Sequence, residues 1–309
     1  MRAIGVTEFG GIDSLRTLDL PEPHPGPGQV RIRVRAATVN PTDVGLVSGR
    51  YELRGDGPWV PGAEAAGTVS EVGEGADFAV GDPVAAIVVP YSRTGGAYCD
   101  EVIVPADQVV RVPDGVDAVH AATLPMNGLT AALTVELLRV SPGRTVAVTG
   151  AAGAYGGYVV QLAKADGARV VADAKESDRD LVAALGADDV VRRGDDVADR
   201  IRALVPDGVD GLADGAVQHE LVAPAVRDGG RFVSIRRWTG PAGRGIEVMS
   251  LLVYEHAART DLLRRLVSLL ESDAITLRVA DVLPAEQAAD AMRRLAEGGV
   301  RGRLVLDFS

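Results

Sequence analysis

A glycine-rich segment, GAAGAYGG (Gly150–Gly157), has the residue types and spacing needed to bind a phosphate-containing ligand. It follows a β-branched run, Thr145–Thr149, and opens a stretch with helical periodicity, Gly156–Asp166. A dinucleotide pyrophosphate binds free N–H groups at a helix N-terminus, so the turn residues must have small side chains or none. Gly153 allows the backbone to approach the phosphates, and Gly156 allows the helix to pack closely on the strand.

The spacing departs from G-x-G-x-x-G because Ala151 stands at the first glycine position. A strand, a turn and a helix nevertheless follow one another within a βαβ unit of about thirty residues, and in that context a glycine-rich turn indicates dinucleotide binding. The alternative is a tight βα turn in a sheet that binds no nucleotide. We predict dinucleotide binding through Gly150, Ala151, Ala152, Gly153, Ala154, Tyr155 and Gly156.

Charged residues near the end of the next apolar run bear on whether the dinucleotide is NAD or NADP. Asp173, taken alone, favours NAD because a carboxylate there bonds the ribose 2′-hydroxyl and repels a 2′-phosphate. Lys175, Arg179 and Arg192 favour NADP because cations neutralise a phosphate. Side-chain direction decides between the two, since Asp173 and Ala174 face opposite sides of a strand. All of these charges also fit an ordinary solvated surface.

The elements needed to position this turn are predicted by the alternation of short apolar runs and longer helical stretches after Asp117. We expect strands at Thr145–Thr149, Arg169–Asp173, Asp189–Val191, Gly211–Asp214, Arg231–Ile235 and Gly245–Met249. Helices are expected at Gly156–Asp166, Asp178–Leu185, Val197–Leu204, Glu220–Val226, Thr260–Ser272 and Ala285–Glu297. This alternation is typical of a doubly wound parallel sheet.

The first 118 residues differ from the rest because short apolar runs are separated by glycine and proline. Val30–Val34 alternates as a half-buried strand does, and further runs follow at Gly67–Val72, Pro83–Val89 and Glu101–Pro105. This pattern favours a compact β-rich domain. The final run, Arg303–Phe308, is expected to rejoin it.

Length and composition limit the classes of function. The 309 residues are too many for one ordinary core, so two domains are expected. The net charge of −11 argues against nucleic acid as a partner. Cys99 is the one cysteine, which excludes an intramolecular disulfide and a cysteine-rich zinc site. The N-terminus lacks the pattern of a secretion signal and no apolar stretch is long enough to span a membrane, so we expect a cytoplasmic protein.

The order of segments resembles the medium-chain dehydrogenase/reductase superfamily, in particular its quinone oxidoreductase (zeta-crystallin-like) branch, over nearly the whole chain. The resemblance depends on the order and spacing of several segments, each weak alone. They are VNPTD (Val39–Asp43), SGRY (Ser48–Tyr51), PGAEAAGTVSEVG (Pro61–Gly73), GDPV (Gly81–Val84), GGAYCDEVIVPA (Gly95–Ala106), AATLPMNGLTA (Ala121–Ala131), the glycine-rich turn with its helix, DGGRFVSI (Asp228–Ile235) and RGRLVL (Arg301–Leu306).

The resemblance implies an α/β fold with two domains: a GroES-like β-rich catalytic domain and a Rossmann domain with a doubly wound parallel sheet. The expected ranges are 1–118 for the catalytic domain, 119–255 for the Rossmann domain, and 256–309 for a C-terminal segment that completes the first. It also implies an active site in the cleft between them and a homodimer. With the cations near Asp173, the resemblance makes NADPH the expected cofactor.

Zinc is not expected, on the evidence of two positions. Zinc-dependent relatives carry Cys where Asn40 stands here, and His where Ala63 stands, and neither residue present is a serviceable zinc ligand. Without a Lewis acid, alcohol oxidation is disfavoured. Reduction of a quinone or an α,β-unsaturated carbonyl remains open, because the acceptor is already electrophilic and its enolate needs only hydrogen bonds.

The resemblance carries roles over to individual residues. Asn40, Asp43 and Tyr51 are expected to border the nicotinamide and the substrate, with Asn40 donating a hydrogen bond and Tyr51 giving either a proton or a stacking wall. Thr130 and the backbone of Asp214, Gly215 and Ala216 are expected to contact the cofactor. Glu64 is expected to be structural, and Cys99 to be a small packing residue.

Two alternative functions remain open. One keeps the fold and cofactor but changes the acceptor, as in an enoyl-thioester reductase or a tailoring reductase of secondary metabolism. The other is a non-catalytic NADP-binding protein. Turnover with a panel of acceptors separates the first from a quinone or enone reductase, and the absence of all turnover would favour the second.

Overall fold

The computed structural model describes residues 1–51, 57–92, 95–240 and 243–309, which form two compact units. The first unit comprises Met1–Met126, Tyr254–Ser268 and Leu277–Ser309, and the second comprises Asn127–Val253 and Leu269–Thr276. Leu269–Thr276 belongs to the second unit, where the backbone N–H of Thr276 donates to the Gln161 side-chain oxygen at 2.8 Å. Across the described residues, no helix has the length and apolar character required to cross a membrane.

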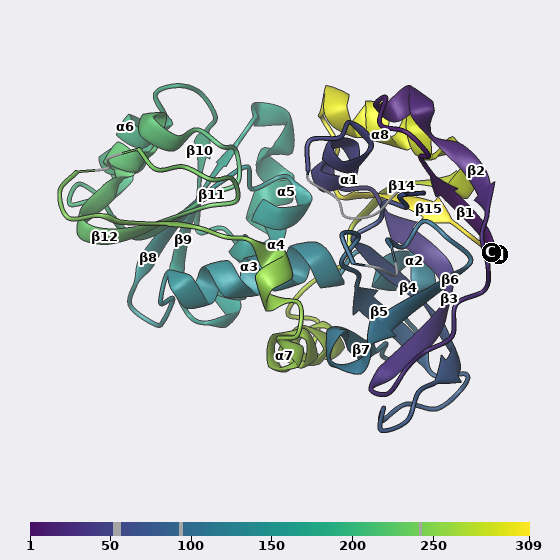
Figure 1. Cartoon of the computed structure of the whole chain (residues 1–309). Helices are drawn as coiled ribbons and strands as arrows, with labels where there is room; N and C mark the ends of the chain where they lie inside the picture. The colour runs from purple at the N-terminus through teal and green to yellow at the C-terminus, as the bar shows by residue number, and fades with distance from the viewer. Residues whose placement is uncertain (52–56, 93–94, 241–242) are drawn as a thin grey trace. The chain divides into compact units, whose positions relative to one another are not determined.

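A parallel sheet of six strands forms the centre of the second unit (Figure 1). Its strands are β8 (Thr145–Thr149), β9 (Arg169–Ala174), β10 (Asp189–Arg192), β11 (Val209–Asp214), β12 (Val226–Ser234) and β13 (Glu247–Ser250). They lie in the order β10-β9-β8-β11-β12-β13 with parallel pairing throughout. The chain winds outward from β8 in one direction and from β11 in the other, so the switch point lies between these two strands. This confirms the expected doubly wound sheet.

The helices of the second unit largely follow the expected periodicity. They are α3 (Pro125–Leu137, which begins in the first unit), α4 (Ala154–Ala165), α5 (Arg179–Ala184) and α6 (Val197–Leu204), with a short 3-10 turn, η3 (Glu176–Asp178), before α5. The prediction of a helix at Glu220–Val226 is wrong. Two 3-10 turns, η4 (His219–Leu221) and η5 (Ala223–Ala225), stand there instead, because Pro224 has no N–H to continue an α-helical ladder.

Gly156 sets how closely α4 packs on the turn that precedes it. A Cβ atom at this position would lie 2.3 Å from the Gly150 carbonyl oxygen and 2.8 Å from the Ala151 Cα atom, both of them backbone. A Cβ at Gly153 would meet only the Gly150 oxygen, at 3.2 Å.

We therefore expect Gly156→Ala to lower the free energy of unfolding by about 1–3 kcal/mol, as overpacking does. Gly153→Ala is the matched control and should cost less than about 1 kcal/mol, because its Cβ would have one close neighbour, at 3.2 Å, in place of the backbone clashes at Gly156. Urea unfolding of both variants measures the difference, and equal stability of the two would contradict the packing argument.

The first unit is built on a larger, mainly antiparallel sheet. Its strands are β3 (Gln29–Thr38), β4 (Glu64–Val72), β5 (Pro83–Ile87), β6 (Glu101–Pro105), β7 (Val109–Arg111), β14 (Val279–Pro284) and β15 (Arg303–Asp307). The order is β14-β15-β3-β4-β5-β7, with β6 also paired to β3, and β1 (Arg2–Gly5) and β2 (Arg16–Asp19) form a separate antiparallel pair. The C-terminal β15 pairs with β3, Val305 opposite Thr38, which confirms that the end of the chain rejoins the N-terminal domain (Figure 1).

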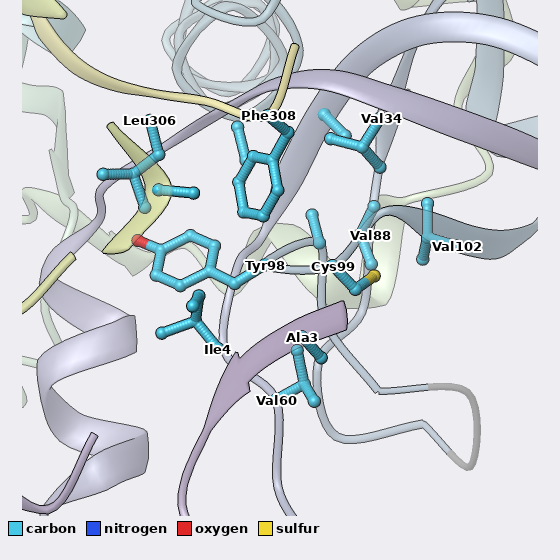
Figure 2. Packing of buried hydrophobic residues seen from close by; sticks show 14 of the residues in the cluster. Ala3, Ile4, Val34, Val60, Val88, Tyr98, Cys99, Val102, Leu306 and Phe308 are labelled. Carbon is cyan, nitrogen blue, oxygen red and sulfur yellow. The ribbon is translucent and has the colours of Figure 1, made fainter. Parts of the chain in front are cut away.

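Among its described residues, the first unit also contains α1 (Pro41–Val47), α2 (Ala118–Ala121), most of α7 (Thr260–Glu271) and α8 (Ala288–Glu297). The first unit also has its own hydrophobic core, in which residues from both ends of the chain pack together. Figure 2 shows Ile4 beside Tyr98, with Leu306 and Phe308 from the C-terminal segment in the same cluster. Cys99 is buried there and burial raises the pKa of its thiol to about 12, so it is an inert packing residue, as expected. A separate core around Phe232 and Trp238 lies in the second unit.

Candidate active site

The glycine-rich turn lies at the carboxyl end of β8, next to the switch point of the parallel sheet. Gly150 has a φ of +70°, and a Cβ atom there would lie 2.8 Å from the Gly215 carbonyl carbon, so only glycine fits. Gly153 is the N-cap of α4. The N–H groups of the first helical turn, Ala154 to Gly156, have no carbonyl partner within the helix and carry its positive dipole end. This arrangement suits the pyrophosphate of a dinucleotide, which binds at such a crevice.

Asp214 anchors the loop after β11 beside that turn. Its Oδ1 accepts hydrogen bonds from the Thr149 hydroxyl (2.7 Å) and the Gln218 N–H (3.1 Å), and its Oδ2 accepts one from the His219 N–H (2.8 Å). The Gly215 N–H donates to the Thr149 carbonyl at 3.1 Å. Asp214 is fully buried, so its side chain positions the backbone of Gly215 and Ala216 rather than offering oxygens to a ligand.

The loop after β11 also stores backbone strain. Val217 and His219 have φ values of +57° and +47°, which side chains rarely adopt. Such strain costs roughly 1–3 kcal/mol per residue and persists where surrounding bonds fix the chain. The Asp214 carboxylate supplies those bonds, at the place where the expected cofactor contacts lie.

Tyr155, the large residue of the glycine-rich turn, points its side chain into the protein. The residue is 7 % exposed, its hydroxyl lies 2.9 Å from the Thr134 hydroxyl, and a Cβ at Gly215 would lie 2.9 Å from its ring. The large residue at the helix start therefore fills space beneath the loop after β11. Its backbone N–H remains in the first turn of α4.

Asp173 does not face outward toward a ribose. The residue is 1 % exposed; its Oδ1 accepts the Gly150 N–H at 2.7 Å, and its Oδ2 forms an ion pair with Arg193 at 2.8 Å. Both oxygens are therefore already bonded within the protein. The argument for NAD that depended on Asp173 loses its physical basis, because a carboxylate held this way does not reach a 2′-hydroxyl without breaking these bonds.

The other residues expected around the cofactor are spread over the second unit. Lys175 is exposed directly after β9, and Thr130 is half-buried on α3. Arg179 and Arg192 line a groove of about 470 Å³ beside the edge strand β10, where an Arg179 Nη donates to the Val190 carbonyl at 3.0 Å. Arg179 and Arg192 thus share a groove at the edge of the sheet, whereas Lys175 follows β9, the strand that pairs with β8.

In the first unit, Asn40 and Asp43 form the N-terminal cap of α1. The Asn40 N–H donates to Asp43 Oδ2 at 2.7 Å, while the Gly62 N–H and the Tyr98 hydroxyl donate to the Asp43 oxygens at 2.9 and 3.1 Å. Burial raises the pKa of Asp43 from 3.8 to about 6, although the N–H groups of Asn40 and Gly62 oppose the rise. Asp43 is fully buried, so this structure shows it holding α1 in place rather than facing a ligand.

Asn40 belongs to a buried polar cluster with Thr38, Glu64 and Arg303. Arg303 Nη2 donates to Asn40 Oδ1 at 2.7 Å, to Glu64 Oε1 at 2.5 Å and to the Thr38 hydroxyl, which itself donates to Glu64. The other Glu64 oxygen accepts the Met126 N–H at 2.6 Å. Glu64 is therefore structural, as expected. The cluster also fixes which way the Asn40 amide faces, because its oxygen is bonded to a cation.

Tyr51 lies apart from this cluster, in an aromatic group with Tyr91 and Tyr254. The Tyr51 and Tyr91 rings are 5.3 Å apart between centroids, and the Tyr91 and Tyr254 rings are 5.2 Å apart, both edge-on. The Tyr254 hydroxyl donates to the Thr42 hydroxyl at 3.3 Å. A Cβ at Gly45 would lie 2.7 Å from the Tyr51 ring, so this glycine lets the ring pack against α1.

Some described residues that lie beside the predicted site residues were not identified from the sequence: Tyr91, Tyr254 and Arg303 in the first unit, and Arg193 in the second. Arg303 lies within the RGRLVL segment, and Arg193 follows Arg192 directly, so a signal existed for both. Strand alternation around Asp173 was the available signal for Arg193. Tyr254 is far from Tyr51 in the chain, and nothing local in the sequence joins them.

Models of known protein families match segments in both parts of the chain. Residues 26–114 match the model of the alcohol dehydrogenase GroES-like domain, and residues 185–306 match that of a zinc-binding dehydrogenase. A chloroplastic quinone-oxidoreductase homolog of Spinacia oleracea is 26 % identical, covering 99 % of this chain and 98 % of its own. A probable zinc-binding mitochondrial oxidoreductase of Arthroderma benhamiae is 30 % identical, covering 80 % of this chain and 79 % of its own. A chloroplastic NADPH-dependent alkenal/one oxidoreductase of Arabidopsis thaliana is 28 % identical, covering 99 % of this chain and 79 % of its own.

Solved structures show the same architecture. An NAD-dependent alcohol dehydrogenase superposes with a TM-score of 0.89 at 30 % identity, covering 100 % of both chains. A mycobacterial quinone oxidoreductase superposes with a TM-score of 0.84 at 30 % identity, covering 99 % of both chains. A mycobacterial protein complexed with NADPH superposes with a TM-score of 0.88 at 29 % identity, covering 99 % of this chain and 100 % of its own. The chain belongs to the medium-chain dehydrogenase/reductase superfamily, in its quinone oxidoreductase branch, and is an oxidoreductase with a nicotinamide-dinucleotide-binding fold.

Proposed function

We propose that this oxidoreductase reduces a quinone or an α,β-unsaturated carbonyl compound with hydride from NADPH and without zinc. The names of its relatives support the acceptor class, since they include a quinone-oxidoreductase homolog and an alkenal/one oxidoreductase. The NADPH complex of a similar mycobacterial protein supports the cofactor, although a similar structure is that of an NAD-dependent enzyme.

The main support for a zinc-free reaction is that Asn40 and Ala63 stand where zinc-dependent relatives have zinc ligands. The Asn40 oxygen is bonded to Arg303 at 2.7 Å, and Ala63 is fully buried and has no donor atom. A matching family model is named for zinc binding, but these two side chains do not form a zinc site. Alcohol oxidation needs such a Lewis acid, whereas a conjugated acceptor does not.

The residues present fit a nicotinamide dinucleotide on structural grounds. Gly150 and Gly156 leave no room for a side chain, and the N-terminus of α4 offers N–H groups to a pyrophosphate. When bound, NADPH supplies the hydride, so the protein's part is to bind, orient and protonate. Asp214 holds the loop backbone and the Arg303 cluster holds Asn40. Tyr51 is the proposed proton donor to the enolate that forms on the acceptor.

Tyr51→Phe is expected to lower kcat for enone reduction by about 100-fold, the lower end of general acid catalysis. The ring and its packing on Gly45 are kept, so the Kd for NADPH should stay the same. Steady-state kinetics with fluorescence titration of NADPH measures both. An unchanged kcat would show that solvent donates the proton and that Tyr51 serves only as a wall.

The reaction class is tested with the full chain after dialysis against EDTA. NADPH and NADH oxidation is followed at 340 nm with quinones, alkenals and enoyl thioesters as acceptors. Alcohol oxidation is followed at the same wavelength as reduction of added NADP⁺ or NAD⁺. The proposal predicts turnover of quinones or alkenals without added zinc. Preference for enoyl thioesters would favour the alternative acceptor. No turnover of any acceptor despite dinucleotide binding would favour a non-catalytic NADP-binding protein.

A further inference from the structure

The three tyrosines of the aromatic group in the first unit, Tyr51, Tyr91 and Tyr254, are joined by their hydroxyls as well as by their rings. Tyr91 contacts both of the others, with ring centroids 5.3 Å from Tyr51 and 5.2 Å from Tyr254, and its hydroxyl interacts with the hydroxyls of both. The Tyr254 hydroxyl is bonded in turn to the Thr42 hydroxyl at 3.3 Å. A hydroxyl chain therefore runs from Tyr51 through Tyr91 and Tyr254 to Thr42.

Helix α1 holds both ends of this hydroxyl chain. Thr42 and Gly45 are three positions apart on α1, so they are neighbours on one face of the helix. A Cβ atom at Gly45 would lie 2.9 Å from the Tyr51 hydroxyl oxygen and 3.0 Å from the ring carbon that carries it. The hydroxyl end of Tyr51 therefore rests on α1 one turn away from Thr42, and Thr42 itself is half-buried.

The two inner tyrosines of the hydroxyl chain remain protonated at neutral pH. Burial raises the pKa of the Tyr91 and Tyr254 hydroxyls above the usual value of 10, and the nearby Asp43 carboxylate adds to the rise in both. A neutral hydroxyl donates one hydrogen bond and accepts others, and its hydrogen rotates to suit its partners. Each hydroxyl can thus donate toward Tyr51, where a negatively charged oxygen would be the strongest acceptor.

We infer that Tyr91 is the positioning residue of the proton donor Tyr51, and that Tyr254 and Thr42 connect the pair to solvent. This inference rests on the proposed function, because Tyr51 is the proton donor proposed there. Tyr51 is held by Tyr91 on one side and by α1 at Gly45 on the other. Its hydroxyl is thereby fixed in direction and has a neighbour that can replace its proton.

The proton moves along the hydroxyl chain in one direction. The electron pair of the acceptor's enolate forms a new C–H bond with the Tyr51 proton, and the O–H bond of Tyr51 breaks. Tyr91 then gives its proton to the Tyr51 oxygen, and Tyr254 gives its proton to Tyr91. Thr42 restores Tyr254, and water restores Thr42 and leaves as hydroxide. Water thus supplies one proton for each acceptor reduced, and every hydroxyl returns to its starting state.

The test measures kcat and KM for alkenal reduction by the full chain, with the Kd of NADPH measured by fluorescence. Tyr91→Phe should lower kcat by about 10-fold, the low end for losing a hydrogen bond to a charged group. The rings stay in contact, so KM and the Kd of NADPH should change by less than about twofold. Tyr254→Phe should lower kcat by a smaller factor, because it removes a link further from Tyr51. The matched control is Ser48→Ala, which removes a hydroxyl from the end of α1 that donates to the Val44 carbonyl. It should leave kcat unchanged.

The double variant Tyr51→Phe with Tyr91→Phe separates a role through Tyr51 from a structural role. It should be no slower than Tyr51→Phe alone, because the effects of residues that act as a unit do not add. A further 10-fold loss in the double variant, or an unchanged kcat in Tyr91→Phe or in Tyr254→Phe, would overturn the hydroxyl chain and leave the reductase intact. An unchanged kcat in Tyr51→Phe would overturn both the hydroxyl chain and the proposed donor. A wild-type chain that turns over no acceptor would overturn the proposed function itself, and this inference with it.

Discussion

Gly153→Val is expected to weaken dinucleotide binding by about 100-fold or more, equivalent to about 2.8 kcal/mol, while the chain stays folded. Gly153 caps α4 in an extended conformation, with φ −73° and ψ 170°, which a β-branched residue adopts without strain. A Cβ there has one close neighbour, the Gly150 oxygen at 3.2 Å, so the chain has room for the valine, and we expect its methyl groups to occupy space at the helix N-terminus. A pyrophosphate bound to the first-turn N–H groups needs that space.

Titration of the variant with NADPH, followed by fluorescence, measures this loss. Gly153→Ala is the graded control and should lose less affinity than the valine variant, because it adds only one methyl group. The thermal midpoint of both variants should stay near that of the wild type. Unchanged NADPH binding by Gly153→Val would contradict the placement of the pyrophosphate at this turn.

Arg303→Met is expected to destabilise the first unit by about 3–5 kcal/mol, the cost of leaving one member of a buried ion pair without its partner. Glu64 is fully covered and Arg303 is 5 % exposed, so water does not replace the lost contact. The substitution also removes the bond to Asn40 and leaves Thr38 without its cationic donor. Because β15 carries Arg303 while β3 and β4 carry Thr38 and Glu64, the loss weakens the junction of the C-terminal segment with the first sheet.

Urea unfolding followed by circular dichroism measures the change. Arg169→Met is the matched control, because its exposed ion pair with Asp189 should contribute no more than about 1 kcal/mol. The double variant Arg303→Met with Glu64→Leu should recover part of the loss, since no buried charge is left alone. If Arg303→Met is no less stable than Arg169→Met, the cluster does not hold the unit together.

The elements of both units were predictable because their patterns are local. Strand β8, the glycine-rich turn and α4 follow directly from the alternation of residue types at Thr145–Ala165. The return of β15 to the first sheet followed from the family resemblance and an apolar run at the end of the chain. The helix expected at Glu220–Val226 failed because helical spacing was given more weight than Pro224.

The site was less predictable because side-chain direction and long-range partners decide it. The sequence made Asp173 the residue on which the expected cofactor preference depended, but only the structure shows that it turns toward Gly150 and Arg193. The Arg303–Glu64 pair joins residues 239 positions apart, and no local pattern reveals such a contact. The aromatic group of Tyr51, Tyr91 and Tyr254 depends in the same way on tertiary packing.

The central claim, hydride transfer from NADPH to a conjugated acceptor without zinc, is tested most directly by isotope tracing. EDTA-treated protein is mixed with NADPH deuterated at C4 of the nicotinamide ring and an alkenal, and the product is analysed by mass spectrometry. Both C4 stereoisomers of the cofactor are used, because the protein transfers hydrogen from one face only. We predict one deuterium at the β-carbon of the saturated product with one of the two cofactors. A reduced product that carries no deuterium from either cofactor would contradict the account.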